Sequence, residues 1–250
     1  CCTFLWAHGN CGRAATLIAP QPGLARATRS QKRARSKLEW GSYMGEFDYR
    51  DAGVPVRPDI GEAHAGAWHA IANAGTWWTG AERVAIAAEV RHATNCDFCA
   101  TRKRALSPYT VAGTHNSGAG LSAGAIDAVH RIVNDQGRIT ASFVQSLQPG
   151  VSIEQYVELV GVTVLVFSID EFNRGLGVAP AALPVPVPGE PSHYRPARID
   201  DSTGFVPMVA ADGAIGEEAD LWPNGRSANV LRALSLVPNA FREWIPAAAA

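Results

Sequence analysis

The sequence predicts a helical protein, and three observations support this. From Asp59 onward, apolar residues recur with the period of an α-helix until a glycine interrupts them. Thr79 stands where its side chain can cap a helix over the following residues. Ser152 and Gln155 form a capping-box pattern ahead of the most apolar segment, 153–174, which lacks turn residues and is far too long for a strand. We interpret this segment as a buried helix.

Glycines predict a loop between residues 107 and 122, and a short helix should follow from Ser122 to about residue 134. Ile126, Val129 and Val133 are expected on its inner face, with His130 on the surface. Beyond it, six prolines between 178 and 196 forbid a regular helix and predict a stiff, extended strap lying along a neighbouring subunit. The segment 229–244 then looks like the opening helices of a second helical repeat.

Cys96 and Cys99 are the feature that points most directly to chemistry. Two cysteines in a CxxC arrangement can close a small disulfide ring, so that one thiol attacks a substrate and the other resolves the product. The pair therefore predicts a redox centre.

Acid–base residues surround the pair. Glu82, Glu89, Cys96 and Lys103 recur every seven residues, so any stretch that stays helical places them along one stripe. His92 lies one turn before Cys96. A carboxylate, an imidazole and a thiol at these spacings can form a proton path.

Thr94 and Asn95 allow a second geometry, because both are poor helix formers. Asn95 would be a good N-cap for a new helix beginning at Cys96. The positive end of that helix dipole would then favour the thiolate of the first cysteine.

A zinc site is the main alternative, but it needs two more ligands. The other cysteines are Cys1, Cys2 and Cys11, and there is no second CxxC. We therefore expect no metal at this pair. A structural disulfide would close only a short loop, and an inert, half-buried pair of thiols is the remaining alternative.

The region 77–107, with Glu89 ahead of Asn-Cys-Asp-Phe-Cys at 95–99, and the segment 120–140 resemble the carboxymuconolactone decarboxylase / AhpD-like alkylhydroperoxidase superfamily. The resemblance covers about residues 50–178. It implies an all-α helical bundle that assembles as a trimer or hexamer and uses no cofactor. The predicted fold is then this bundle followed by the strap and a partial second helical repeat.

The resemblance also implies roles. Cys99 would be the attacking thiol and Cys96 the resolving thiol. Peroxidatic members usually carry a histidine four residues after the second cysteine, where this chain has Lys103. A lysine stabilises a thiolate by charge but is a poor proton acceptor at neutral pH. His92 or His115 is the candidate substitute.

Two functions follow. The first is a thiol-dependent peroxidase that reduces hydroperoxides through a CxxC dithiol–disulfide cycle and needs an external thiol reductant. The alternative is a cofactor-free lyase or isomerase acting on a lactone-type substrate, with His115, His92 or a glutamate handling protons. The relay carboxylate is either Glu82 or Glu89.

Composition excludes several classes of partner. A formal charge of −1 over 250 residues implies no nucleic-acid partner. The longest apolar stretch, 159–169, is too short to cross a bilayer. Two reduced cysteines suit the cytoplasm better than a secreted protein.

The predicted organisation has four parts: an atypical N-terminal extension (1–43), an AhpD-like helical domain (44–178), a proline-rich linker or strap (179–226) and a partial second repeat (227–250). The extension is rich in arginine and poor in acids. It resembles either a transit peptide or sequence upstream of a start at Met44, and we favour the second.

Overall fold

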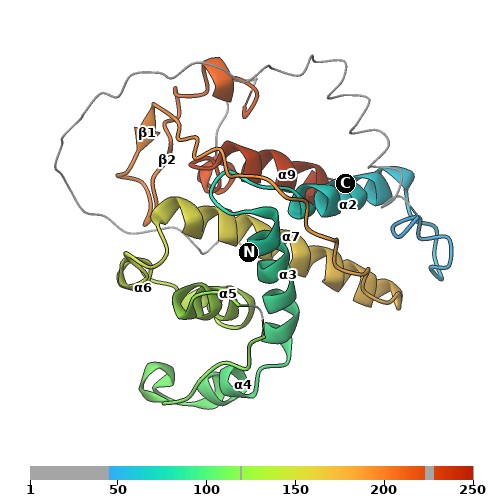
Figure 1. Cartoon of the computed structure of the whole chain (residues 1–250), viewed down its shortest axis with the longest axis horizontal. Coiled ribbons are helices and arrows are strands. Elements are labelled where there is room, and N and C mark those ends of the chain that lie inside the picture. Colours follow the sequence, from blue (N-terminus) through green and yellow to red (C-terminus); the bar gives the residue numbers. More distant parts are fainter. Residues whose placement is uncertain (1–44, 119, 223–227, 250) are drawn as a thin grey trace.

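The computed structural model describes residues 45–118, 120–222 and 228–249 (Figure 1). The predicted all-α class is confirmed, since the described residues are mainly helical, with one two-stranded sheet. The N-terminal extension, with its three cysteines, lies outside them. In chain order the elements are α2 (Pro58–Ala72), α3 (Gly80–Thr94), α4 (Asp97–Arg104), η1 (Pro108–Thr110), α5 (Ala123–Asn134), η2 (Gln136–Arg138), α6 (Ala141–Ser146), α7 (Ile153–Leu176), β1 (Ile199–Asp200), β2 (Met208–Val209), η3 (Gly216–Glu218), α8 (Asn229–Arg232) and α9 (Pro238–Ala249).

Helix α7 forms the centre of the core, and the predicted capping box starts it. The Ser152 hydroxyl accepts a hydrogen bond from the Gln155 backbone, and the Gln155 side chain accepts one from the Ser152 backbone. Helices α3, α5 and α9 pack against α7. In Figure 1, α2 and α9 lie above α7, and α5 and α4 lie below it. The prediction of a buried helix at 153–174 is confirmed.

Helix α9 of the same chain covers part of α7. An added Cβ at Gly161 of α7 would lie 3.0 Å from the Cβ of Ala240, so the glycine allows α9 to approach closely. Part of this apolar helix is thus covered within its own chain, while the trimeric or hexameric assembly stays a prediction.

The proline-rich segment 178–196 contains no helix or strand, as predicted. Its backbone bonds to helices of its own chain, and its expected place along a neighbouring subunit stays a prediction. The Trp68 indole donates to the carbonyl of Ala182 at 2.7 Å. The backbone N–H of Val187 donates to the carbonyl of Ala72 at 2.8 Å. These bonds pair a backbone carbonyl and a backbone N–H group of the strap, which has no sheet partner to bond them.

A small sheet follows the strap and was not predicted. In it, β1 runs antiparallel to β2, with Ile199 opposite Val209. The guanidinium of Arg232 donates to Asp200 at 2.8 Å and to the carbonyl of Val209 at 2.9 Å, which ties α8 to the sheet. Strands of two residues leave too little periodicity for the sequence to indicate them.

No helix among the described ranges combines the length and the apolar character that crossing a bilayer requires.

A buried cluster of charged side chains links helices α3, α7 and α9. Arg83 of α3 lies 3.6 Å from Glu158 of α7 and also bonds to Glu243 of α9. The backbone N–H of Trp77 donates to Glu158 at 2.6 Å. Burial outweighs the attraction of Arg83 and raises the pKa of Glu158 to about 7.

The raised pKa predicts a pH dependence of stability. The folded protein keeps the Glu158 proton up to about pH 7, whereas the unfolded chain loses it near the ordinary value. The contribution of this group to the free energy of unfolding is thus full at low pH and is lost as pH rises through the folded-state pKa. Urea titrations between about pH 5 and pH 8 should show Glu158→Gln with a flatter profile than the wild type, by at most about 3 kcal/mol. Parallel profiles would contradict this assignment.

Candidate functional site: a buried dithiol with two histidines

The two cysteines lie where α3 ends and α4 begins. Helix α3 stops at Thr94, Asn95 is its C-cap, and Cys96 is the N-cap of α4. The single stripe expected through Glu82, Glu89, Cys96 and Lys103 is therefore broken, because Thr94 and Asn95 interrupt the helix. The alternative of a helical restart is confirmed, although Cys96, not Asn95, occupies the N-cap position.

Both thiols are free and buried, with 4% of Cys96 and 7% of Cys99 exposed. Cys99 stands in the first turn of α4, so both sulfurs lie at the N-terminal end of this helix. That end carries unpaired N–H groups and partial positive charge, which favour a thiolate.

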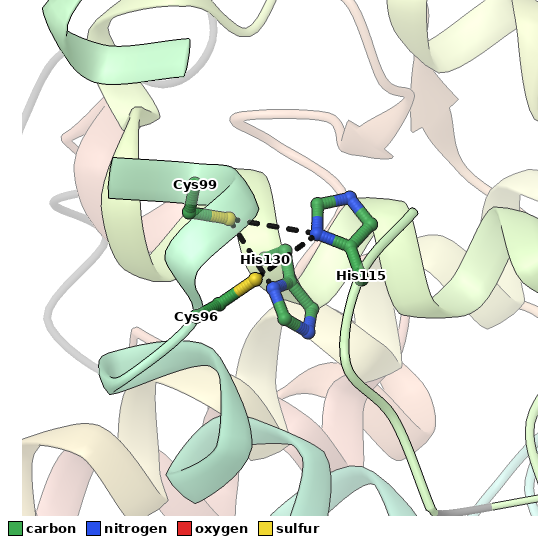
Figure 2. A group of neighbouring side chains, drawn as sticks. All are labelled: Cys96, Cys99, His115 and His130. Carbon is green, nitrogen blue, oxygen red and sulfur yellow. Dashed lines mark hydrogen bonds between the residues drawn. The ribbon is translucent and has the colours of Figure 1, made fainter. Parts of the chain in front are cut away.

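Two histidines from later segments face the sulfurs (Figure 2). The Sγ atom of Cys99 lies 3.3 Å from Nδ1 of His130 and 3.5 Å from Nδ1 of His115. The Sγ atom of Cys96 lies 3.7 Å from the same Nδ1 atom of His115. All four atoms lie within 4.8 Å of one another. The structure thus gathers two thiols and two imidazoles at one point.

Each histidine turns its other nitrogen toward a carboxylate. Nε2 of His130 lies 2.7 Å from Glu89 of α3, and both residues are fully buried. Nε2 of His115 lies 3.0 Å from Asp127 of α5. A carboxylate only accepts hydrogen bonds, so each Nε2 carries a hydrogen. A neutral imidazole then presents Nδ1 as an acceptor to the sulfurs, and a protonated imidazole donates from Nδ1 to a thiolate.

The carboxylates are themselves held in place. The Ser117 hydroxyl donates to Glu89 at 2.7 Å. Arg102 and Arg131 each donate to Asp127 at 3.1 Å. These bonds fix the orientation of both imidazoles through a second layer of contacts.

The loop that carries His115 is held against the CxxC by close packing. The ring of Phe98, which lies between the two cysteines, meets the His115 ring edge-on with centroids 5.0 Å apart. A Cβ added to Gly113 would lie 2.6 Å from the Phe98 ring, so only glycine allows the loop to approach this closely. Gly113, one of the glycines that predicted a loop here, therefore also allows His115 to lie next to the two cysteines.

The surroundings of the two thiols give them different pKa values. Burial opposes ionisation of Cys96, but hydrogen bonds from the backbone of Cys99 and from His115 outweigh it and lower the pKa of the Cys96 thiol to about 7. Burial, together with the neighbouring Cys96 charge, raises the pKa of the Cys99 thiol to about 12. Cys96 is therefore the sulfur that ionises first.

The pKa values of the two histidines are also shifted in opposite directions. Burial lowers the pKa of His130, which keeps it neutral and able to accept a proton. For His115, burial is outweighed by the bond to Asp127 and the proximity of Cys96, so its pKa is raised. Asp127 stays ionised, because its bonds to His115 and the arginines outweigh burial and lower its pKa to about 2.

A narrow cavity of about 20 Å³, roughly the space of one water, opens onto the site. Cys99 and both histidines line it, whereas Cys96 is not among its lining residues. The other lining residues are Arg102, Lys103, Tyr109, Arg131, Asn134 and Asp135. Cys99 is thus the sulfur that a small substrate would reach.

Four of the seven predicted site residues come together: Cys96, Cys99, Glu89 and His115. Lys103 is exposed and lies at the edge of the cavity. The structure does not bring the other two into the cluster. His92 is exposed on α3. The Glu82 carboxylate accepts hydrogen bonds from the backbone and hydroxyl of Thr79, so it caps the start of α3, at the far end from Cys96.

Sequence reasoning missed His130 and Asp127. The expectation that His130 lies on the surface is wrong, because it is fully buried. Of the residues expected on the inner face of α5, Val129 is buried and Ile126 and Val133 are half-buried. The buried face also includes Ala125, Ala128 and His130. A usable signal was an imidazole placed between Val129 and Ile132 in an apolar helix, where burial demands a polar partner.

The expectation that two zinc ligands are missing is wrong. The other cysteines do not supply them, but the structure places two histidines beside the sulfurs. Histidine nitrogens and cysteine sulfurs are both ligands that Zn²⁺ prefers.

The chain matches no protein-family model, no curated protein and no solved structure, so the superfamily resemblance stays a prediction.

Proposed function

We propose that this protein is a thiol-dependent oxidoreductase that reduces hydroperoxides through a disulfide between Cys96 and Cys99. One observation carries the proposal: the Cys99 sulfur lines a cavity and lies 3.3 Å from a histidine whose other nitrogen is held by Glu89 at 2.7 Å. A thiol, a base and an orienting carboxylate in this order are the arrangement that activates a nucleophile.

In the first step, Nδ1 of His130 takes the proton of the Cys99 thiol as the Cys99 sulfur attacks the terminal oxygen of the hydroperoxide. An S–O bond forms while the O–O bond breaks. The alkoxide leaves with the proton from His130 and becomes an alcohol. Cys99 is thereby oxidised by two electrons to a sulfenic acid.

In the second step, the Cys96 thiolate attacks the Cys99 sulfur. The S–S bond forms, the S–O bond breaks, and hydroxide leaves as water with the proton held by His115. The low pKa of Cys96 favours this step, since the thiolate is the attacking form. An external dithiol then reduces the disulfide and is itself oxidised, which implies a reducing compartment such as the cytoplasm.

The alternative function rests on a separate observation. The rings of His115 and His130 lie with centroids 4.0 Å apart, and each is paired with a carboxylate. Two such pairs also suit proton transfer in a cofactor-free lyase or isomerase acting on a lactone-type substrate, with the cysteines as bystanders.

Thiol counting separates the two functions. The reduced protein is treated with one equivalent of cumene hydroperoxide, or of hydrogen peroxide as a smaller probe, and digested after alkylation. We expect a loss of two hydrogens confined to the peptide that contains Cys96 and Cys99, with one equivalent of the alcohol formed from cumene hydroperoxide. A Cys96→Ser/Cys99→Ser double variant is the control. Unchanged thiols with both peroxides would contradict the proposal and favour the alternative.

A further inference from the structure

The four side chains of the site form a set that matches a structural metal centre. Two cysteine sulfurs and two histidine nitrogens converge, one pair from the α3–α4 junction, one histidine from a loop and one from α5 (Figure 2). Four N and S ligands in a closed set are the preferred shell of Zn²⁺. We propose that the reduced protein binds one Zn²⁺ ion through Cys96, Cys99, His115 and His130.

The distances between the ligand atoms fit a tetrahedron. With Zn–S bonds of about 2.3 Å and Zn–N bonds of about 2.0–2.1 Å, a tetrahedral ion separates a sulfur from a nitrogen by about 3.5 Å. Three of the four sulfur–nitrogen distances are 3.3, 3.5 and 3.7 Å, and all four ligand atoms lie within 4.8 Å of one another. One ion fits between these atoms after a small inward movement of the ligands that stand furthest apart.

The orientation of both imidazoles is the second argument. A histidine that binds zinc usually donates its other N–H to a carboxylate, which fixes the ring and increases its basicity. Both histidines do so here, His130 to Glu89 and His115 to Asp127, and both turn Nδ1 toward the sulfurs. A catalytic relay to Cys99 needs only one such pair. A Zn²⁺ ion bound by both histidines accounts for the second histidine–carboxylate pair.

Charge balance also suits the buried position. Two thiolates and two neutral imidazoles carry a total of −2, which one Zn²⁺ neutralises. A closed shell of this kind leaves no open position for a substrate, so the metal would not act as a Lewis acid on the peroxide. The ion instead occupies the same two sulfurs that the disulfide joins.

Metal binding and the disulfide are therefore mutually exclusive states of one site. Oxidising the two thiolates to a disulfide removes two electrons and leaves sulfurs that no longer bind Zn²⁺, which departs as the ion. The inference goes beyond the proposed function and does not require it, because any two-electron thiol oxidant would release the metal.

The test uses the full chain, reduced with a thiol-free phosphine and freed of metal without oxygen. Zn²⁺ is titrated against a chromophoric chelator, and Co²⁺ is titrated separately as a spectroscopic probe. We expect one equivalent of either ion and, for cobalt, a thiolate charge-transfer band with the intense visible bands of tetrahedral geometry. Diamide, which accepts two electrons and two protons to become the hydrazine, should release one Zn²⁺ per disulfide formed.

Variants identify the ligands. His115→Ala alters a residue of a loop outside the helices of the core, so the fold should survive. It should weaken Zn²⁺ binding by at least about 100-fold, more than the 10- to 100-fold typical of losing an outer-shell partner. Asp127→Asn should weaken it by about 10- to 100-fold. His92→Ala, on the exposed face of α3, is the matched control and should bind as the wild type does.

Three results would overturn the inference. The first is binding no tighter than that of the Cys96→Ser/Cys99→Ser double variant. The second is an octahedral cobalt spectrum without a thiolate band, and the third is unchanged affinity in His115→Ala. A protein that binds zinc but does not consume peroxide would leave the inference standing and refute the proposed function. A protein that consumes peroxide without binding zinc would do the reverse.

Discussion

Replacing Cys99 with serine should abolish hydroperoxide turnover, lowering its rate by at least about 10³-fold. The Cys99 sulfur is the one that lines the cavity, and His130 lies beside it to take its proton. A serine hydroxyl cannot reduce a peroxide, because oxygen does not form the sulfenic acid intermediate. Peroxide consumption with a dithiol reductant measures the effect.

Cys96→Ser is the matched control, since it removes the other sulfur at a similar burial. This variant should react once and then stop with a sulfenic acid on Cys99, seen as the gain of one oxygen atom and trapped with dimedone. Multiple turnovers by Cys99→Ser, or a sulfenic acid on Cys96 in that variant, would show that the assigned nucleophile is wrong.

His130→Gln should slow the reaction of Cys99 with hydroperoxide by about 10²- to 10⁴-fold, the usual contribution of a positioned base. Glutamine keeps a polar group in the buried position but accepts no proton at neutral pH. Stopped-flow measurement of the first turnover, rather than steady-state activity, isolates this step from reduction of the disulfide.

A second readout separates chemistry from folding. Alkylation by iodoacetamide, followed peptide by peptide, should slow at Cys99 more than at Cys96, because only Cys99 contacts His130. His92→Gln is the control and should leave both rates unchanged. Equal slowing at both thiols would indicate a general loss of structure, and an unchanged first turnover would contradict the role of His130 as the base.

Local signals in the sequence were sufficient for most of the helices. The capping residues Thr79 and Ser152 mark where α3 and α7 begin, and both capping boxes are formed. Such signals act over three or four residues, so they are readable without knowledge of the fold. The same locality explains why the helix break at Thr94 and Asn95 could be anticipated.

The site depends on contacts that no local signal contains. His130 meets Glu89 and Cys99, residues far earlier in the chain, only because α5 packs against α3 and α4. The resemblance drew attention to position 103, where Lys103 replaces the expected histidine. In this structure the imidazole comes instead from α5, which supplies a base beside Cys99 from another direction.

The most direct test of the dithiol–disulfide cycle is a redox titration of the wild-type chain, with EDTA present, across glutathione or dithiothreitol buffers of defined potential. The fraction of Cys96–Cys99 disulfide is measured by alkylation and mass spectrometry. The account predicts one two-electron transition, with the ratio of oxidised to reduced protein changing tenfold for about every 30 mV. Thiols that stay reduced in the most oxidising buffer, or a transition that does not join these two sulfurs, would contradict it.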